Sequence, residues 1–281
     1  MEGENESHYR SQMKILSPLL AGLISLSSTA FAQSEGPAEN DDSATAYVGA
    51  IGLLSSEYLG SADEELRPLP YLSVDNFKGI DLVATSLSYR AMEIGTGQGL
   101  DKWSLRAGPS LTYQGGRDSE DSDTLDGLDD IGGSVLAGGY LRGSFGPVGL
   151  RLTAGQDIAG GHDGLVADAS IGTFLPLGRL KVLPSASLNW GSSKHNQSFF
   201  GITDAQSQVS NLAVNDVNSG VYGYSLNLVS WYELTDNYVV TLIGSHRWFD
   251  EEAKNSPIIL AEDGSDTGLF VAFGIARKFN L

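Results

Sequence analysis

The chain has 281 residues, of which 35 are acidic and 17 basic, and its formal net charge is −18 at neutral pH. That charge excludes a nucleic-acid-binding protein, and the lack of cysteine excludes disulfides, thiolate metal sites and cysteine nucleophiles. The mean hydropathy of −0.09 fits either a soluble protein or a transmembrane β-barrel, in which only alternate strand residues face lipid.

A bacterial export signal is predicted close to the N-terminus. Lys14 supplies a positive charge, residues 15–26 are apolar or small, and Ala30-Phe31-Ala32 has the small-x-small pattern of a cleavage site. We therefore predict a signal peptide over residues 13–32, preceded by an over-extended start at residues 1–12. The alternative, a retained membrane anchor, is disfavoured because about 17 residues with several Ser and Thr are short for a span. The acidic and polar residues 33–43 have the composition of a disordered periplasmic leader.

Residues 44–281 contain a long series of segments in which apolar and polar side chains alternate. In residues 103–113 one face is apolar and closed at both ends by an aromatic residue, Trp103 and Tyr113. A spacing of about ten residues between these rings suits a tilted strand that crosses a bilayer. Residues 148–156, 222–228 and 269–281 repeat the pattern. The pattern predicts an all-β fold, a transmembrane antiparallel β-barrel of about 12 strands in the bacterial outer membrane.

The second face of these segments distinguishes a barrel from a soluble β-sandwich, which also has alternating strands. This face is Gly-rich and polar, and it includes Arg106, Arg151 and Lys278. Such residues fit the lumen of a barrel better than a dry core, and they are our predicted lumen residues. Glu93 and Asp168 are candidate partners for these cations, and pairing of this kind would close the lumen.

Loop lengths supply a test of topology, because outer-membrane barrels have short periplasmic turns and long outer loops. Counting back from a periplasmic C-terminus, the turns near residues 146, 178 and 236 fall inside, and the long loops 55–67, 114–130, 192–219 and 250–266 fall outside. This agreement requires residues 79–95 to form two strands that turn near Thr85. The predicted strands are 45–54, 68–75, 79–84, 87–95, 103–113, 131–143, 148–157, 166–176, 181–191, 220–232, 238–249 and 267–281.

Several short motifs, in a fixed order over nearly the whole mature chain, carry a resemblance to a known family. They include Tyr-Leu-Gly-Ser at 58–61, Leu-Asp-Gly-Leu-Asp-Asp at 125–130, Gly-Gly-His-Asp-Gly at 160–164 and Phe-Phe-Gly-Ile-Thr at 199–203. On these residues the chain resembles the MipA/OmpV family of MltA-interacting outer-membrane proteins from Gram-negative bacteria. The matching positions are Tyr58, Gly60, Ser61, Pro70, Tyr71, Gly108, Pro109, Arg117, Gly127, Leu128, Gly161, His162, Gly164, Phe200, Gly201, Ser256 and Pro257.

The resemblance implies an outer-membrane barrel that acts as a scaffold between a lytic transglycosylase and a penicillin-binding peptidoglycan synthase. Two alternatives stay open: a small-solute channel, and a surface adhesin or stress-response barrel. The expected surroundings are outer-membrane lipid and lipopolysaccharide. No catalytic residue, cofactor or metal ligand is carried over from the family, and the oligomeric state is not indicated.

The other residues that could carry out chemistry are explained more simply by structural roles. Seven carboxylates over residues 118–130 could chelate Ca²⁺, but they lack the spacing of a calcium loop, so a solvated acidic loop is favoured. Divalent ions could still bridge this loop to lipopolysaccharide phosphates. His162 could act as a metal ligand or base, but we expect its ring nitrogens to bond to loop backbone. His246 cannot form a dyad with Ser245 or Arg247, because neighbours in a strand point to opposite faces. An enzyme is therefore not expected.

Overall fold

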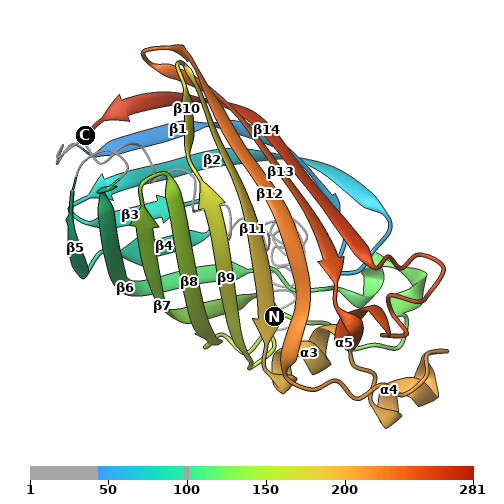
Figure 1. The fold of residues 1–281 in the computed structure, drawn as a ribbon. Helices are drawn as coiled ribbons and strands as arrows, with labels where there is room; N and C mark the ends of the chain where they lie inside the picture. Colours follow the sequence, from blue (N-terminus) through green and yellow to red (C-terminus); the bar gives the residue numbers. More distant parts are fainter. Residues whose placement is uncertain (1–43, 98–100) are drawn as a thin grey trace, which may run out of the picture.

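The computed structural model describes residues 44–97 and 101–281, which form one closed wall of antiparallel strands with a cap at one end (Figure 1). The predicted over-extended start, signal peptide and leader all lie outside the described residues. Among the described residues, none of the helices combines the length and apolarity that a membrane span requires.

Fourteen strands build the wall of the described chain. Their bounds are β1 Thr45–Ser56, β2 Glu64–Phe77, β3 Ile80–Val83, β4 Ser86–Tyr89, β5 Met92–Thr96, β6 Trp103–Gln114, β7 Ser134–Phe145, β8 Val148–Asp157, β9 Leu165–Thr173, β10 Leu175–Leu177, β11 Leu180–Gly191, β12 Gly220–Thr235, β13 Tyr238–Phe249 and β14 Thr267–Asn280. Each of these strands pairs antiparallel with its neighbours, and β1 pairs with β14 to close the ring.

The wall has 12 strand positions over the described residues, as the sequence predicts. β4 and β5 pair in succession with β6, and β9 and β10 pair in succession with β11, so each pair occupies one position. The predicted split of residues 79–95 is confirmed: β3 and β4 form a hairpin that turns at Ala84 and Thr85, with Val83 opposite Ser86. Predicted and observed strand ends differ mostly by one to four residues, the usual uncertainty at a strand terminus.

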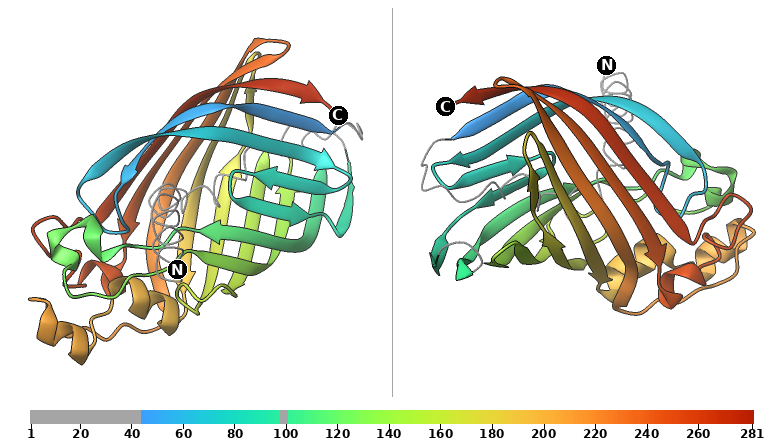
Figure 2. Two further views of the ribbon diagram at one scale, coloured as in Figure 1. Left: turned by 180° about the vertical axis from the view of Figure 1, so that it is seen from behind. Right: turned by 45° about the horizontal axis from the view of Figure 1, so that its top comes forward.

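Short turns and long loops separate to opposite ends of the barrel (Figure 2). The turns at residues 78–79, 146–147, 178–179 and 236–237 lie at the end that holds the C-terminus, and the helices lie at the other end. By the topology of outer-membrane barrels, the first end is periplasmic and the second faces outward.

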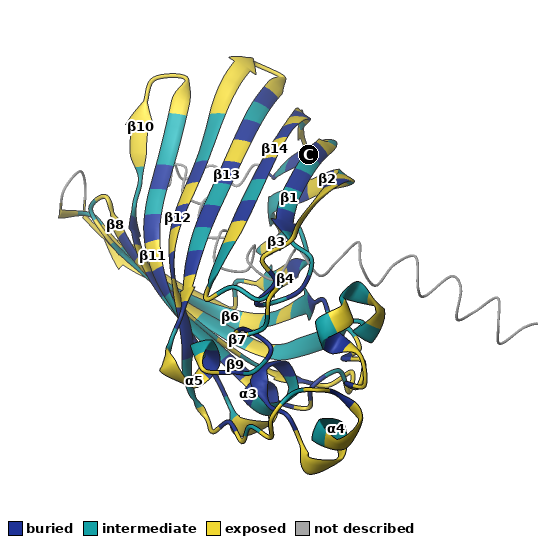
Figure 3. Ribbon diagram, turned by 90° about the vertical axis from the view of Figure 1, so that its right-hand side faces the viewer, coloured by how far each residue is buried: buried dark blue, intermediate teal, exposed yellow. Residues whose placement is uncertain are grey.

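Burial alternates along the strands, and Figure 3 shows this as stripes along β11 to β14. On β8, Leu150 and Leu152 are 56% and 51% exposed, whereas Arg151 between them is 8% exposed. Apolar side chains therefore cover the outer face of the barrel, where lipid accommodates them. The apolar faces predicted for residues 103–113, 148–156 and 269–281 are the outer ones.

One side chain predicted on the outer face departs from the pattern. Tyr222 is 3% exposed, although Tyr224 and Leu226 on the same strand are exposed as expected. The cause is a β-bulge: Asn189 pairs with Gly223 and Trp190 with Val221, so Tyr222 has no partner in β11 and turns inward. A one-residue shift of this kind reverses the side-chain faces, which alternation alone does not reveal.

Beside the short β3–β4 hairpin, part of β2 has strand pairing on one side only. Among the described residues, β3 pairs with β2 only from Ser73 onward, so Glu64–Leu72 have a strand partner on the β1 side alone. Pro68 and Pro70 lie in this stretch, and proline lacks the backbone N–H that a further strand would need. The two prolines therefore blunt an edge that would otherwise be open to strand addition.

Candidate functional site

The four long outer loops and the shorter loop at residues 158–164 fold together into a cap over one end of the barrel (Figures 1 and 2). The loops contain η3 Ser119–Asp121, η4 Asp123–Leu125, α3 Ser193–Phe200, α4 Asp204–Val209 and α5 Glu251–Lys254. Backbone bonds join loops that are far apart in sequence: Ser265 donates to the carbonyl of Gly60 at 2.8 Å, and Ser61 bridges to Gly264. The cap is thus one folded unit rather than a set of separate loops.

Two apolar clusters form the core of the cap, and we call them together the cap core. Phe199, Phe200 and Ile202 from the α3 region are at most 1% exposed, and Leu125 and Ile258 from other loops are fully buried. The rings of Phe200 and Phe249 meet edge to face with centroids 5.7 Å apart. The members are Tyr58, Leu125, Leu128, Ile131, Phe199, Phe200, Ile202, Val217, Tyr222, Phe249, Ala253, Ile258 and Ile259.

Polar side chains join the loops through the backbone carbonyls at the end of α3. The Phe200 carbonyl accepts from Asn215 Nδ2 at 2.8 Å and from Ser256 Oγ at 2.7 Å, and the Phe199 carbonyl accepts from Arg117 Nη1 at 3.0 Å. Helix-terminal carbonyls lack partners within the helix, so these bonds satisfy groups that would otherwise be buried and unpaired. Burial lowers the pKa of Arg117 to about 10, so it remains charged at neutral pH.

Most of the family motif positions meet in this cap. Tyr58, Leu128, Phe200 and Ser256 are all buried there. Gly127 has a φ of +82° and lies so close to the end of α4 that a Cβ would be 2.9 Å from the backbone N of Ser210. The remaining cap positions are Gly60, Ser61, Arg117, Gly161, His162, Gly164, Gly201 and Pro257. Pro70 and Tyr71 lie in β2, and Gly108 and Pro109 in β6. These motifs therefore reflect the folding of one cap more than a set of separate sites.

His162 bonds to loop backbone as expected, but its ring also contacts His195, which the sequence did not predict. Its Nδ1 accepts from the backbone N of Gly164 at 2.9 Å, and its ring meets that of His195 edge to face at 4.8 Å. His195 lies in α3 with Nδ1 3.0 Å from the side-chain oxygen of Asn196. Among the described residues, neither Nε2 atom has a hydrogen-bond partner. Burial lowers the pKa of both rings, that of His195 to about 3, so both are neutral at pH 7.

Several acidic side chains of the 118–130 loop form hydrogen bonds that stabilise turns within the same loop. Asp118 caps η3 and Asp121 bonds back to the backbone N of Asp118 at 3.0 Å. Asp130 accepts from Ser119, and Asp129 accepts from Gln206 in α4 at 3.1 Å. In the described part of the chain, no three His, Asp or Glu residues are placed to hold one metal ion. Bridging to lipopolysaccharide through divalent ions stays a prediction, and a chelator that left the barrel's stability unchanged would contradict it.

Below the cap, one side of the lumen is packed with apolar residues. Leu53 and Leu183 are fully buried, and Val229 is 2% exposed. The rings of Phe174 and Trp231 stack beneath them with centroids 6.0 Å apart. We call this the apolar side of the lumen; its buried members are Ile51, Leu53, Tyr71, Leu183, Val229, Ile243, Phe270, Ala272 and Ala276. These members come from β1, β2 and β11 to β14, so that part of the lumen is filled by packed apolar side chains.

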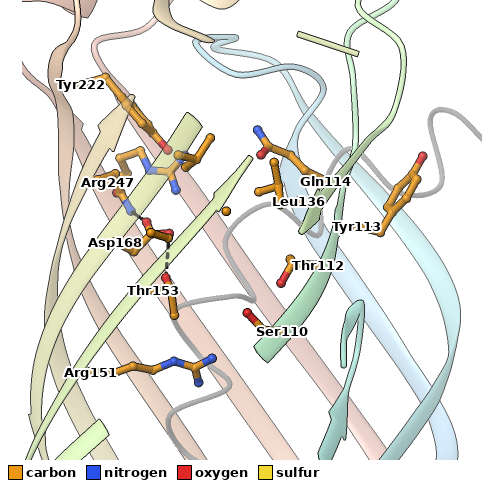
Figure 4. Close-up of a pocket in the computed structure, with 14 residues that line it drawn as sticks. Ser110, Thr112, Tyr113, Gln114, Leu136, Arg151, Thr153, Asp168, Tyr222 and Arg247 are labelled. Atoms are coloured by element: carbon orange, nitrogen blue, oxygen red, sulfur yellow. Dashed lines mark hydrogen bonds between the residues drawn. The ribbon is translucent and has the colours of Figure 1, made fainter. Parts of the chain in front are cut away.

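The opposite side of the lumen, along β6 to β9, is polar and hollow (Figure 4). A cavity extends from Arg151 up to Tyr222 beneath the cap. A second cavity shares Arg151 and reaches Arg106 and Tyr140. Asp168 accepts from Thr153 Oγ1 at 3.4 Å and from Asn189. We call this the basic side of the lumen.

The predicted lumen residues occupy different places within the barrel. Arg106 and Arg151 both line the second cavity, and Arg106 Nε donates to Glu93 at 2.7 Å, one of the pairings considered from the sequence. Lys278 lies near the end of β14, away from these cavities. Sequence reasoning missed Arg142, which lies between Arg106 and Arg151, and it missed His195. Arg142 could have been found by aligning the strand registers, since it is opposite Arg106 and Arg151.

His246 lies on the outer face beside Trp248, with ring centroids 4.4 Å apart, whereas Ser245 and Arg247 are buried on the inner face. The expected separation of these neighbours to opposite faces is therefore confirmed.

Comparison with known proteins places the chain in a family. Residues 48–279 match the family model described as MltA-interacting protein MipA. The MltA-interacting protein of Escherichia coli K12 is 27% identical over 270 residues, covering 95% of this chain and all of that one. Outer membrane protein Omp26La of Vibrio anguillarum is 24% identical over 232 residues, covering 81% and 85%.

Solved outer-membrane proteins align with most of the chain, but only loosely. OmpT of Vibrio cholerae gives a TM-score of 0.39 at 7% identity, covering 86% of this chain and 99% of that one. OprD of Pseudomonas aeruginosa gives 0.36 at 8% identity, covering 89% and 97%. The closed barrel and the outer-membrane relatives place the protein in the outer membrane, and the match over 48–279 shows that the chain belongs to the MipA family.

Proposed function

We propose that this protein is a scaffold barrel that holds a lytic murein transglycosylase at the periplasmic face of the outer membrane. The observation that carries the proposal is the match of residues 48–279 to a family described as MltA-interacting. The relative that covers almost the whole chain is named for the same interaction. In our proposal the barrel binds its partner, and this role needs no catalytic residues.

The periplasmic end offers a surface for such a partner. Phe145, Leu177 and Leu234 lie at the tips of successive hairpins and are 64%, 61% and 48% exposed. Apolar side chains at exposed tips favour contact with another protein. The outer end, by contrast, is covered by the cap and is separated from the periplasm by the membrane. We therefore assign the transglycosylase to the hairpin tips.

Binding of purified transglycosylase to the detergent-purified barrel tests the proposal. We expect Leu177→Glu and Leu234→Glu to weaken binding at least tenfold, because each puts a charge into an apolar contact. Leu260→Glu is the matched control, since Leu260 is 70% exposed in the outer cap. The proposal fails if wild-type protein does not bind, or if all three variants bind like wild type.

We extend the proposal to a peptidoglycan synthase held at the same periplasmic face, so that a hydrolase and a synthase are brought together. The test is a pull-down with both enzymes present and each alone. Recovery of the synthase only when the barrel is present supports the bridge. Recovery of the transglycosylase without the synthase would restrict the barrel to one partner.

A small-solute channel is the second candidate, and the hollow basic side of the lumen favours it. The cap core opposes it, because its buried rings cover the outer end. We expect the lumen to be largely closed to ions. Clear single-channel steps from purified protein in a planar bilayer would reject that expectation and favour transport.

A further inference from the structure

The contact between His162 and His195 joins two outer loops that are separate in the sequence. His162 lies in the loop at residues 158–164 and is 4% exposed, and His195 lies in α3 and is fully buried. The two rings meet edge to face with centroids 4.8 Å apart. The His195 ring also contacts Phe199 and Tyr222 of the cap core, with centroids 4.9 and 5.0 Å away. The contact therefore ties α3 to the rest of the cap.

α3 approaches the rim of the barrel closely at His195. A Cβ on Gly164, just before β9, would lie 2.6 Å from the backbone N of His195, and a Cβ on Gly191, at the end of β11, would lie 2.5 Å from its Nδ1. A side chain at either position would collide with the helix. Lys194, the charged residue of α3, is exposed. His195 is thus the residue by which α3 docks on the strand ends.

Hydrogen bonds fix the tautomer of His162. Its Nδ1 accepts from the backbone N of Gly164 at 2.9 Å and so carries no proton. In the neutral ring the proton is therefore on Nε2, which has no acceptor among the described residues. The turn around the ring is also fixed, because the backbone N–H groups of His162 and Asp163 both donate to Asp157 at 2.9 Å.

His195 has the opposite tautomer. The side-chain nitrogen of its neighbour Asn196 donates to the backbone carbonyls of Gly191, Asn218 and Gly220, at 3.3, 2.9 and 3.4 Å. The side-chain oxygen of Asn196 is therefore the atom that lies 3.0 Å from Nδ1 of His195, and Nδ1 must donate to it. This leaves Nε2 of His195 as an acceptor, and it has no donor in the described part of the chain.

Neither ring can take up a further proton while the contact is closed without losing an interaction. A proton on Nδ1 of His162 would oppose the N–H of Gly164, donor against donor. A proton on Nε2 of His195 would place a charge and an unpaired donor beside Phe199 and Tyr222. Both changes leave buried polar groups without partners, which is costly. The closed contact therefore requires both rings to be neutral.

Charged neighbours do not offset the burial of the two rings. Burial lowers the pKa of His162, although Asp157 at the end of β8 and Asp163 in the same loop act to raise it. Burial, His162 and Arg247 of β13 together lower the pKa of His195 to about 3. In an open cap each ring regains a pKa of about 6.5, so opening takes up protons and becomes more favourable as the pH falls. The protons need no path through the closed cap, because they bind in the open one.

We infer that the contact of His162 with His195 is an acid-sensitive latch: it holds α3 on the barrel rim at neutral pH and releases α3 in acid, while the barrel wall stays closed. Release uncovers the apolar rings of the cap core and the cavity that reaches up to Tyr222 (Figure 4). The outer surface of the protein thereby changes with the pH of the medium. The latch lies at the opposite end of the barrel from the hairpin tips, so it goes beyond the function proposed above.

Cysteine labelling tests the latch, because the chain has no cysteine of its own. Ser256→Cys is the reporter: Ser256 is fully buried and donates to the carbonyl of Phe200 at the end of α3, so release of α3 exposes it. Leu260→Cys is the matched control in the same loop, since Leu260 is 70% exposed. The measured quantity is the maleimide reaction rate of the reporter divided by that of the control. This ratio cancels the effect of pH on the thiol itself.

We expect the ratio to rise at least tenfold between pH 8 and pH 5. Each ring that is neutral in the closed cap and has a pKa of about 6.5 in the open one favours opening by up to about 30-fold at pH 5. A ratio that does not change with pH would overturn the proposal. A rise accompanied by loss of the heat-modified gel migration of a folded barrel would also overturn it, because the wall would then have unfolded with the cap.

Histidine variants in the reporter background assign the rise to the latch. His162→Asn keeps a side-chain acceptor for Gly164 but does not titrate, and His195→Phe keeps an aromatic ring at the contact. Each should reduce the rise at least threefold. His246→Phe is the control, because His246 lies on the outer face of β13 beside Trp248, and it should leave the rise unchanged. An undiminished rise in either latch variant would overturn the assignment of the latch to this pair.

Discussion

The apolar and basic sides of the lumen share one outer wall but differ on their inner faces. Leu53, Leu183 and Val229 belong to one buried apolar cluster on one side, while Arg142 and Arg151 line a cavity on the other. Both sides present apolar residues to lipid, so the membrane imposes the same outer pattern on each. Lipid does not constrain the inner faces, so some strands can stabilise the barrel there while others bind ligands.

The largest expected effect comes from removing packing on the apolar side. Leu53→Ala should lower the free energy of unfolding by about 2–5 kcal/mol, because it leaves a cavity in a fully buried cluster. Thr153→Ala on the basic side should cost about 1 kcal/mol or less, since it removes one long hydrogen bond, 3.4 Å, to Asp168. Urea unfolding in lipid vesicles measures both. Equal losses would mean that the two sides do not differ as described.

The next effect tests the outer face that the two sides share. Leu152→Arg places a charge toward lipid near the middle of β8, the strand that carries Arg151, and should cost about 2–4 kcal/mol. The same vesicle unfolding assay measures it. Leu228→Arg on β12 is the matched change on the apolar side, where Leu228 is 42% exposed. A silent Leu152→Arg would show that β8 does not face lipid there.

The cap core continues the apolar packing into the outer loops. The pH dependence of its stability tests this packing. The pKa of His195 is lowered to about 3 by burial, so the folded cap holds this ring neutral. Stability from this group is present above pH 6.5 and is lost as pH falls from 6.5 toward 3; at pH 5 the loss is about 2 kcal/mol. The protection factors of the amides in residues 192–219, which are corrected for slower intrinsic exchange in acid, should therefore fall as the pH is lowered to 5. His195→Phe should remove most of this acid response, and an unchanged response would contradict the assignment.

The smallest effect is expected in the hollow space of the basic side. Ser110→Asn should change the free energy of unfolding by less than about 0.5 kcal/mol, because Ser110 lines a cavity with room for a larger polar side chain. A clear destabilisation would mean that the cavity is more tightly packed than its lining indicates.

Sequence reasoning could predict the wall of the barrel because alternation is a local property. The faces of β6 and β8 and the split between β3 and β4 follow from two-residue periodicity and loop length. The bulge that turns Tyr222 inward could not be predicted, since it depends on pairing with Asn189 and Trp190, more than 30 residues away.

The candidate sites could be predicted only in part, for the same reason. Arg106 and Arg151 are visible in the alternating pattern, but their adjacency through Arg142 requires the registers of β6, β7 and β8. Likewise, His162 stands out in a glycine-rich motif, whereas its contact with His195 depends on the fold of two separate loops.

The seam between β1 and β14 has a consequence for the order of assembly. Thr45 pairs with Asn280 and Ser55 with Phe270, so the ladder that closes the ring joins residues more than 200 positions apart. All other wall ladders join strands that are near in sequence, and contacts between distant residues form late because loop closure is entropically costly. Until the final strand has been synthesised and paired, the chain is a curled sheet with two unprotected edges. Closure is therefore the committing step of biogenesis, and substitutions at this seam should slow maturation more than they weaken the finished barrel.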